Sequence, residues 1–340
     1  MKKWKCVVCR IWMAITVAVM FSMAMAPCHA TAKSPAPATG ELPDRRISVI
    51  GHRGAAGLAP ENTLAAFARA CEIDVDAVEF DVLLSADGQA VVYHDFRLKP
   101  ELTRSPDGKW LAASPPPAVK DLSLADLKTY NVGRLKPGTG YSRRYPAQTP
   151  ADGERIPTLR EVIRLVAEQC NSKTQLWVEI KTTPEKQGLT PPPEAVSETV
   201  VNILREEKIS DRVRILSFDW RNLMYVKNIA PDIPTVYLSL EGVRLNNIQP
   251  GRPGASPWMA GLDIDDFSGS IPHAIQAAGG RIWAPYYKHL TVSDLNAAHQ
   301  LGIEVFVWTP DTQAAMKRLI DMGVDGIITN RPDRLNSVLD

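Results

Sequence analysis

The amino-acid sequence predicts an α/β fold, a (β/α)8 TIM barrel with a small insertion after the third strand. Short apolar segments alternate with amphipathic helical segments, and this alternation is typical of βαβ units around a parallel sheet. About eight such strands over roughly 290 residues match the size of a closed barrel. The alternative is an open doubly wound sheet, which is disfavoured because no GxGxxG motif follows the first strand.

The expected strands are short runs of β-branched and aromatic residues, bounded by glycine or polar residues. In chain order they span 46–50, 76–82, 90–93, 175–180, 213–218, 235–238, 282–284, 304–308 and 326–329.

Helical segments separate most of these strands. The first begins at Pro60 and continues through LAAFARACE, with a proline and an acid in its first turn. The others span about 158–169, 194–207, a stretch that ends near 229, 292–301 and 312–322.

Residues 96–155 interrupt the alternation. They contain proline- and glycine-rich runs such as SPPPAV and LKPGTGYSRRYPAQTP, with few long apolar stretches. A loop this long inside a barrel is either functional or a small inserted subdomain.

Residues 1–30 have the organisation of a secretory signal peptide: a basic start, an apolar run over 11–26, and small residues at the exit. One alternative is an uncleaved anchor, for which the apolar run is short. The other is a lipoprotein at Cys28, which Pro27 disfavours because a small residue is expected there.

Residues 31–45 are rich in Pro, Ala, Ser and Thr and indicate a flexible leader. The folded domain is then 46–340, in a periplasmic or secreted protein without a stable membrane span once the signal is removed. Nothing in the sequence sets the oligomeric state.

The charge and cysteine content narrow the function classes. A formal net charge of +1 argues against a nucleic-acid-binding protein. Of the five cysteines, only Cys71 and Cys170 lie beyond the signal segment. An exported chain can pair them, but a domain of this size needs no covalent link, so we expect them reduced and buried.

Acidic residues occur at the carboxyl ends of predicted strands, where barrels of this type carry their chemistry. Glu79 and Asp81 alternate on one strand, so they point to the same side, and such close like charges are costly without a cation. Glu179, on another strand, can add a third oxygen, and this donor set suits one divalent cation, Ca²⁺ or Mg²⁺. The alternative is that these carboxylates face solvent or pair with Arg53 and Lys181.

Two histidines and two cations occupy further strand ends. His52 and His94 have the side chain best suited to acid–base chemistry near neutral pH. Arg53 and Lys181 offer positive charge to a phosphate. Trp308 ends a late strand, where an aromatic ring can also be part of the core.

Together these segments resemble the glycerophosphodiester phosphodiesterase family over roughly residues 46–336. The segments are HRGAAGLAPENTLAAFARA, VEFDVLLSADGQAVVYHD and WVEIK, with SFDW, VFVWT and GVDGIITNRPD later in the chain. The resemblance implies an exported bacterial enzyme that hydrolyses glycerophosphodiesters to sn-glycerol 3-phosphate and an alcohol.

The resemblance also implies a role for each candidate residue. It implies that His52 and His94 are the acid–base pair. It implies that the metal ligands are Glu79, Asp81 and Glu179. It implies that the substrate contacts are Arg53, Lys181 and Trp308. For Glu61 and Asn62 it implies helix capping or support of the site.

The sequence departs from the family pattern at Ala56, at Asn330 and in the segment HDFRLKPELTRSPDGKW, so the alcohol specificity stays open. The alternatives are a lysophospholipase D or phospholipase C-like phosphodiesterase on the same barrel, and a secreted binding protein without catalysis.

Overall fold

The structure is a computed structural model that describes residues 46–340 except Gln187 and Arg244. The predicted signal peptide and leader lie outside the described residues. Within the described part of the chain, no helix has both the length and the apolar composition needed to cross a bilayer.

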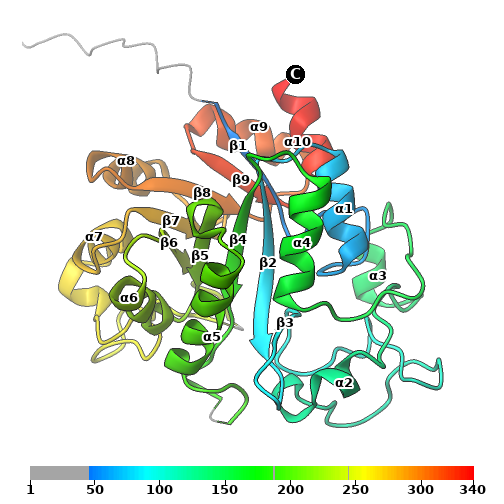
Figure 1. The fold of residues 1–340 in the computed structure, drawn as a ribbon. Coiled ribbons are helices and arrows are strands. Elements are labelled where there is room, and N and C mark those ends of the chain that lie inside the picture. Colours follow the sequence, from blue (N-terminus) through cyan, green and yellow to red (C-terminus); the bar gives the residue numbers. More distant parts are fainter. Residues whose placement is uncertain (1–45, 187, 244) are drawn as a thin grey trace, which may run out of the picture. The chain divides into compact units, whose positions relative to one another are not determined.

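Eight parallel strands close into a barrel, which confirms the predicted fold class (Figure 1). The hydrogen-bonded order is β1-β9-β8-β7-β6-β5-β4-β2, and β1 also pairs with β2. The strands are β1 (Ser48–Gly51), β2 (Ala77–Leu84), β4 (Gln175–Ile180), β5 (Val213–Ser217), β6 (Thr235–Ser239), β7 (Ile282–Pro285), β8 (Glu304–Trp308) and β9 (Gly326–Thr329).

Helices cover the outside of the barrel (Figure 1). They are α1 (Leu64–Glu72), α4 (Leu159–Gln169), α5 (Pro193–Glu206), α6 (Trp220–Ile229), α7 (Ile271–Ala277), α8 (Val292–Gln300), α9 (Gln313–Met322) and α10 (Pro332–Leu339). Short 3-10 turns occur at Ser210–Arg212 and Ile264–Phe267. The short α7 and the terminal α10 were not among the predicted helices.

The barrel interior is a packed core. The rings of Trp177 and Phe306 meet edge to face at 4.8 Å inside it, surrounded by aliphatic side chains such as Ile50 and Val236. A second apolar layer fills the space between the strands and the helices. Because apolar side chains fill the interior, polar chemistry is confined to the carboxyl ends of the strands.

Strand β3 (Ala90–Val92) corrects one expectation, because it is not part of the parallel barrel. It pairs antiparallel with β2, with Val82 opposite Val92. The connection from β2 to β3 is the short turn 85–89, which contains Asp-Gly, whereas a parallel crossover needs about a dozen residues. The hairpin carries the chain back along β2, and the Tyr93 amide donates to the Asp81 carbonyl at 3.0 Å.

The start of the first helix also differs from the prediction. Helix α1 begins at Leu64, and Thr63 is its N-cap, with a side chain that accepts from the Ala66 amide at 3.2 Å. Glu61 and Asn62 precede the helix, so neither of them caps it. Glu61 and Asn62 instead lie in a turn, so their side chains are available to the site.

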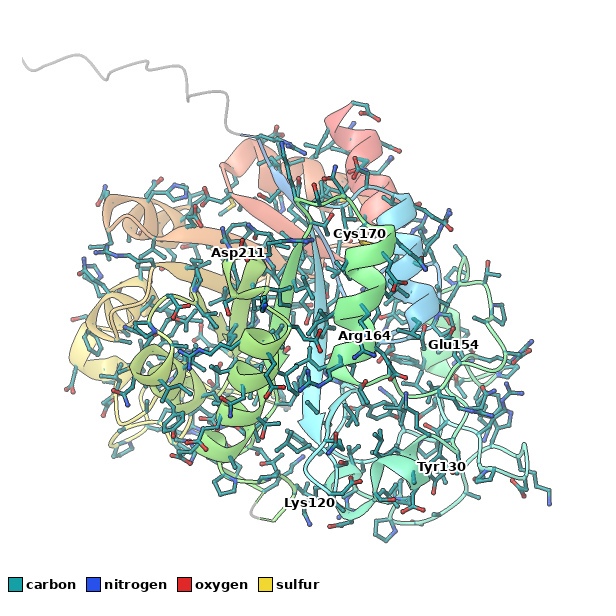
Figure 2. All side chains as sticks on the ribbon, viewed as in Figure 1. Lys120, Tyr130, Glu154, Arg164, Cys170 and Asp211 are labelled. Carbon is teal, nitrogen blue, oxygen red and sulfur yellow. A yellow bond between two sulfur atoms is a disulfide. The ribbon has the colours of Figure 1, made fainter. Side chains whose placement is uncertain are left out.

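The insertion at 96–155 packs against the barrel end to which β2 points (Figure 1). It contains a 3-10 turn (Val119–Asp121), α2 (Leu124–Leu127) and α3 (Gly140–Arg144). Its apolar residues share a core with the β2–β3 hairpin. Glu154, labelled beside α1 in Figure 2, accepts from the Leu64 amide at 3.1 Å, so the insertion also binds the start of α1.

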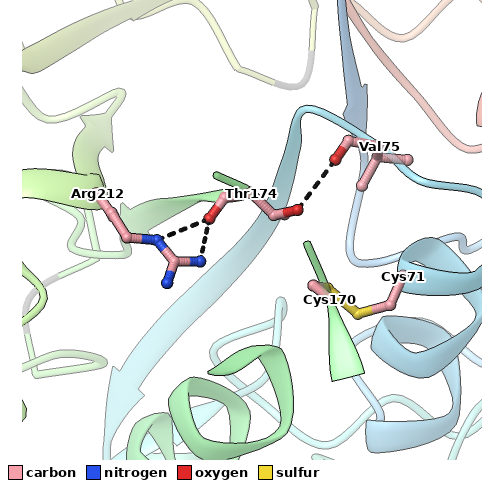
Figure 3. Close-up of a disulfide and its surroundings, with 5 residues drawn as sticks. All are labelled: Cys71, Val75, Cys170, Thr174 and Arg212. Atoms are coloured by element: carbon pink, nitrogen blue, oxygen red, sulfur yellow. Dashed lines mark hydrogen bonds between the residues drawn. A yellow bond between two sulfur atoms is a disulfide. The ribbon is translucent and has the colours of Figure 1, made fainter. Parts of the chain in front are cut away.

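The expectation that Cys71 and Cys170 are reduced and buried is wrong. They form a disulfide and are only half-buried (Figure 3). Cys71 lies in the last turn of α1 and Cys170 ends α4, two helices that pack side by side and bring the Cα atoms to 4.5 Å. This helix packing is a tertiary contact that cysteine spacing does not reveal. A hydrogen bond also links the segments that follow these two helices, because the Thr174 hydroxyl after α4 donates to the Val75 carbonyl after α1 at 3.3 Å.

The double substitution of Cys71 and Cys170 by alanine is expected to lower the free energy of unfolding by about 2–4 kcal/mol, because the disulfide closes a long loop in the unfolded chain. Urea unfolding of the parent and the variant measures the difference. Turnover at low temperature should be retained, because the ends of α1 and α4 lie away from the carboxyl ends of the strands. A reductant should destabilise only the parent; equal sensitivity of both proteins would contradict the prediction.

Candidate active site

A cavity of about 700 Å³ opens at the carboxyl ends of the barrel strands. The predicted residues that line it are His52, Arg53, His94, Glu179, Lys181 and Trp308. Glu79 lies beneath, in a smaller pocket that shares His52, His94 and Glu179. Asp81 contacts Arg53 and Lys181 directly. The structure therefore brings together all eight residues predicted from the sequence.

The carboxylates of Glu79, Asp81 and Glu179 form a buried cluster. One oxygen from each lies within 4.8 Å of the others. Burial, together with the charges of Asp81 and Glu179, raises the pKa of Glu79 well above its usual range. Burial opposes ionisation of Asp81 as well, but His94, Lys181 and Arg53 outweigh it and lower the pKa of Asp81. Without a metal ion, a proton on Glu79 relieves the repulsion in this cluster.

Arg53 and Lys181 partly compensate these charges, which is the pairing considered above as the alternative to a metal site. The Arg53 Nε atom lies 3.3 Å from Asp81, and Lys181 Nζ lies 2.8 Å from Glu179 and 3.3 Å from Asp81. Arg53 also forms an ion pair with a fourth carboxylate, that of Glu61, at 2.7 Å. Four carboxylates thus share two cations.

The cluster fits a divalent cation. Its donors are all carboxylate oxygens, the set that Ca²⁺ and Mg²⁺ prefer. The buried Asp81 Oδ1 atom lies 3.3 Å from Lys181 Nζ but accepts no hydrogen bond, so it can still serve as a ligand. Two positive charges would balance the excess of carboxylates over cations. Glu79, Asp81 and Glu179 are therefore the residues that would hold the ion.

The backbone around Arg53 is shaped for the site. Arg53 and Asn62 both have left-handed φ angles, 51° and 56°, which are uncommon for residues with side chains. The Arg53 amide donates to Glu79 at 3.0 Å, and its carbonyl accepts from the Asn62 amide at 3.1 Å. The Asn62 side chain donates to Asp81 at 2.8 Å. Asn62 thus supports the carboxylate cluster.

A chain of hydrogen bonds orients His52. Asp311 accepts from the side-chain amide of Asn330 at 2.9 Å, so the Asn330 oxygen faces His52 Nδ1 at 2.6 Å. Nδ1 therefore carries the hydrogen, and the lone pair is on Nε2, 3.8 Å from Glu79. Burial and the neighbouring Arg53 lower the pKa of His52 to about 3, so the ring is neutral at pH 7 and able to accept a proton.

His94 has a different environment. It follows β3, and the hairpin places it beside Asp81 at the cavity wall. Its Nδ1 atom lies 3.2 Å from Asp95, and its side chain is about one third exposed, at 30%. The two histidines thus face the same cavity with different neighbours, because His52 Nδ1 meets an amide oxygen and His94 Nδ1 meets a carboxylate.

Aromatic rings form one wall of the cavity. The ring of Trp308 contacts Phe218 at 5.5 Å and Tyr286 at 5.1 Å, and its Nε1 atom donates to the Ala284 carbonyl at 2.9 Å. Trp308 is half-buried and lines the cavity, as the sequence predicted.

The insertion contributes a residue that the sequence did not single out. The Tyr141 hydroxyl donates to the Glu61 carboxylate, whose other oxygen binds Arg53. Tyr141 lies within LKPGTGYSRRYPAQTP, which carries no local signal for this contact. Asp311 was missed for the same reason, whereas the departure at Asn330 did mark a site residue.

The substitution Tyr141→Phe is expected to lower kcat/KM for a glycerophosphodiester by about tenfold, mainly through KM. Glu61 loses a hydrogen bond to a charged group, so Arg53 is held less firmly toward the phosphate. Tyr130, which lies elsewhere in the insertion (Figure 2), provides the matched control as Tyr130→Phe. Equal kinetics for the two variants would contradict the expectation.

These features define a barrel hydrolase built for phosphate esters, because its cations and carboxylates can serve a phosphate and a divalent ion together. The chain belongs to the glycerophosphoryl diester phosphodiesterase family, whose sequence profile matches residues 52–334. The family and the enzyme class predicted from the sequence are thereby confirmed.

Several relatives cover most of the chain. A glycerophosphodiester phosphodiesterase from Caldanaerobacter subterraneus subsp. tengcongensis is 31% identical over 287 residues, which span 84% of this chain and 95% of the relative. One from Bacillus subtilis is 29% identical and spans 87% of both chains.

Solved structures agree in fold. A Silicibacter pomeroyi relative has a TM-score of 0.76 at 34% identity and covers 87% of this chain and 94% of its own. A phosphodiesterase from Oleispira antarctica, solved with its product sn-glycerol-3-phosphate, has a TM-score of 0.63 at 24% identity. That structure covers 86% of this chain and 96% of its own, and supports the fold alone.

Proposed function

We propose that the protein hydrolyses glycerophosphodiesters to sn-glycerol 3-phosphate and an alcohol, with one divalent cation. The observation that carries this proposal is the convergence of a buried carboxylate cluster, two cations and two unlike histidines on one cavity. The activity named for the Caldanaerobacter and Bacillus relatives supports it, and sn-glycerol-3-phosphate is the product named for the Oleispira enzyme.

In this mechanism Arg53 and Lys181 share the charge of the bound phosphate, and Trp308 packs against the substrate. An ion held by Glu79, Asp81 and Glu179 would supply additional stabilisation of the charge on the phosphate oxygens. Tyr141 and Glu61 hold Arg53 in position.

Proton transfer is assigned to the histidines. His52 Nε2 takes the proton of the neighbouring glycerol hydroxyl as its oxygen attacks phosphorus. The phosphorus–oxygen bond to the alcohol breaks, and His94 gives its proton to that alcohol. A water that returns its proton to His94 then opens the cyclic phosphate, and His52 protonates the departing glycerol oxygen. Both histidines end in their starting states.

We also propose an extracytoplasmic location. The signal-like start supports it. The disulfide supports it independently, because disulfides persist mainly in oxidising compartments. Recovery of the protein in a periplasmic or culture fraction with residues 1–30 removed is the expected result.

The direct test is release of glycerol 3-phosphate from glycerophosphocholine by the purified domain, with chelator and then with Ca²⁺ or Mg²⁺ restored. We expect release only with metal. Hydrolysis of lysophosphatidylcholine alone would favour a lysophospholipase D, an activity named for a human relative at 24% identity. Binding without release from any diester would favour the non-catalytic alternative.

A further inference from the structure

The cavity has two chemically different walls. The aromatic wall includes Phe218 and Tyr286, which follow β5 and β7, and Trp308, the last residue of β8. The other, which we call the insertion wall, consists of Lys99, Tyr141, Arg144 and Tyr145. The insertion wall is bound to the turn after β1, and β1 and β2 stand opposite β6 and β7 in the barrel order. The two walls therefore face each other across the phosphate-binding residues.

Positive charge gathers on the insertion wall. Lys99 Nζ lies 4.1 Å above the Tyr141 ring, and the Arg144 guanidinium carbon lies 5.7 Å from the same ring. Lys99 has one acidic neighbour, Asp95, at 3.5 Å. Among the described residues Arg144 has no carboxylate partner, and it is exposed. Two cations held against one ring repel each other unless an anion lies between them.

Tyr145 adds a neutral donor to this wall. Its ring is buried against Tyr141 at 5.5 Å, and it lines the cavity. Burial and the nearby Glu61 raise the pKa of Tyr145, so the phenol keeps its proton and can donate. The wall therefore presents an ammonium, a guanidinium and a hydroxyl, which together match an anionic group.

We propose that the insertion wall is a subsite for the alcohol arm of the diester and selects alcohols that carry their own negative charge, a carboxylate or a second phosphate. This inference rests on the proposed function. Once a phosphate is held at Arg53 and Lys181, its two ester arms leave toward the two walls. The carbon face of glycerol packs on the aromatic wall, and the acidic alcohol reaches Lys99, Arg144 and Tyr145.

Two matched substrate pairs test the proposal. Glycerophosphoserine differs from glycerophosphoethanolamine by a carboxylate, and bis(glycerophospho)glycerol differs from glycerophosphoglycerol by a second phosphate that carries a glycerol. We expect kcat/KM to be about tenfold higher for the member with the additional negative charge, in at least one pair. The value for bis(glycerophospho)glycerol is divided by its number of equivalent phosphodiester groups. The preferred pair identifies the anion. A preference that falls as salt is raised is also expected.

The variant Arg144→Met should reduce this preference to about one, and Lys99→Met should act in the same direction. Lys186→Met is the matched control, because Lys186 lines the cavity from the β4–α5 loop and should leave the preference unchanged. No preference in the parent, or one that survives Arg144→Met, overturns the subsite. Absence of release from every diester, glycerophosphocholine included, overturns the proposed function instead.

Discussion

The substitution His52→Ala is expected to lower kcat for glycerophosphocholine by about 10²–10⁴-fold, the usual contribution of a positioned acid or base. His52 is neutral, and the Asn330 contact directs its Nε2 lone pair into the site. Alanine removes the only proton acceptor that this chain of hydrogen bonds orients. Initial rates of glycerol 3-phosphate release, at saturating substrate and metal, measure the effect.

Two controls separate chemistry from folding. His273→Ala, at an exposed histidine that bonds only to Ser270 among the described residues, should retain full activity. The melting temperature of His52→Ala should still rise when metal is added, because the carboxylate cluster is intact. A His52→Ala protein as active as the parent would refute the catalytic assignment.

The second large effect is expected at the carboxylate cluster. Glu79→Gln should lower metal-dependent turnover by at least about 100-fold, because one of three proposed ligands is lost. A divalent ion at a hundred times its Kd should stabilise the parent by about 2.7 kcal/mol and the variant by much less. Thermal unfolding with chelator, Ca²⁺ or Mg²⁺ gives both quantities and identifies the preferred ion.

In the metal-free protein, Glu79→Gln is expected to change how the free energy of unfolding depends on pH. Folding raises the pKa of Glu79, so the folded chain binds a proton that the unfolded chain releases above its ordinary value of 4.5. The stability of the metal-free parent should therefore fall as pH rises above that value. Glutamine mimics the protonated acid, so Glu79→Gln should remove part of this slope. An unchanged slope would show that Glu79 is ionised without metal.

The sequence was sufficient for the barrel and for the residues at its strand ends. The alternation of apolar strands with helices is a local pattern, and the spacing of Glu79 and Asp81 on one strand fixes their common direction. His52 and His94 were identified although β3 was assigned to the wrong pairing, because the residue type and the strand end were both correct.

What the sequence could not provide depends on contacts between distant segments. Tyr141 reaches Glu61 across 80 positions of the chain. The disulfide of Cys71 and Cys170 depends on how α1 and α4 pack, which no local pattern reports. The state of the Glu61–Asn62 turn was misjudged because a proline and an acid favour a helix start, whereas here the turn is fixed by its contacts with Arg53 and Asp81.

The β2–β3 hairpin has a consequence for how much change in length the chain tolerates. The 85–89 turn sets the register of β3, and a shift of one residue would turn alternate side chains to the opposite face. His94 would then leave the cavity, although no residue of the site had been substituted. The 105–109 turn of the insertion is closed by similar backbone hydrogen bonds, but the residues next to it do not line the cavity. The length of the five-residue turn therefore fixes the position of the proposed proton donor, and single-codon deletions or insertions at 85–89 should lower turnover far more than the same changes at 105–109.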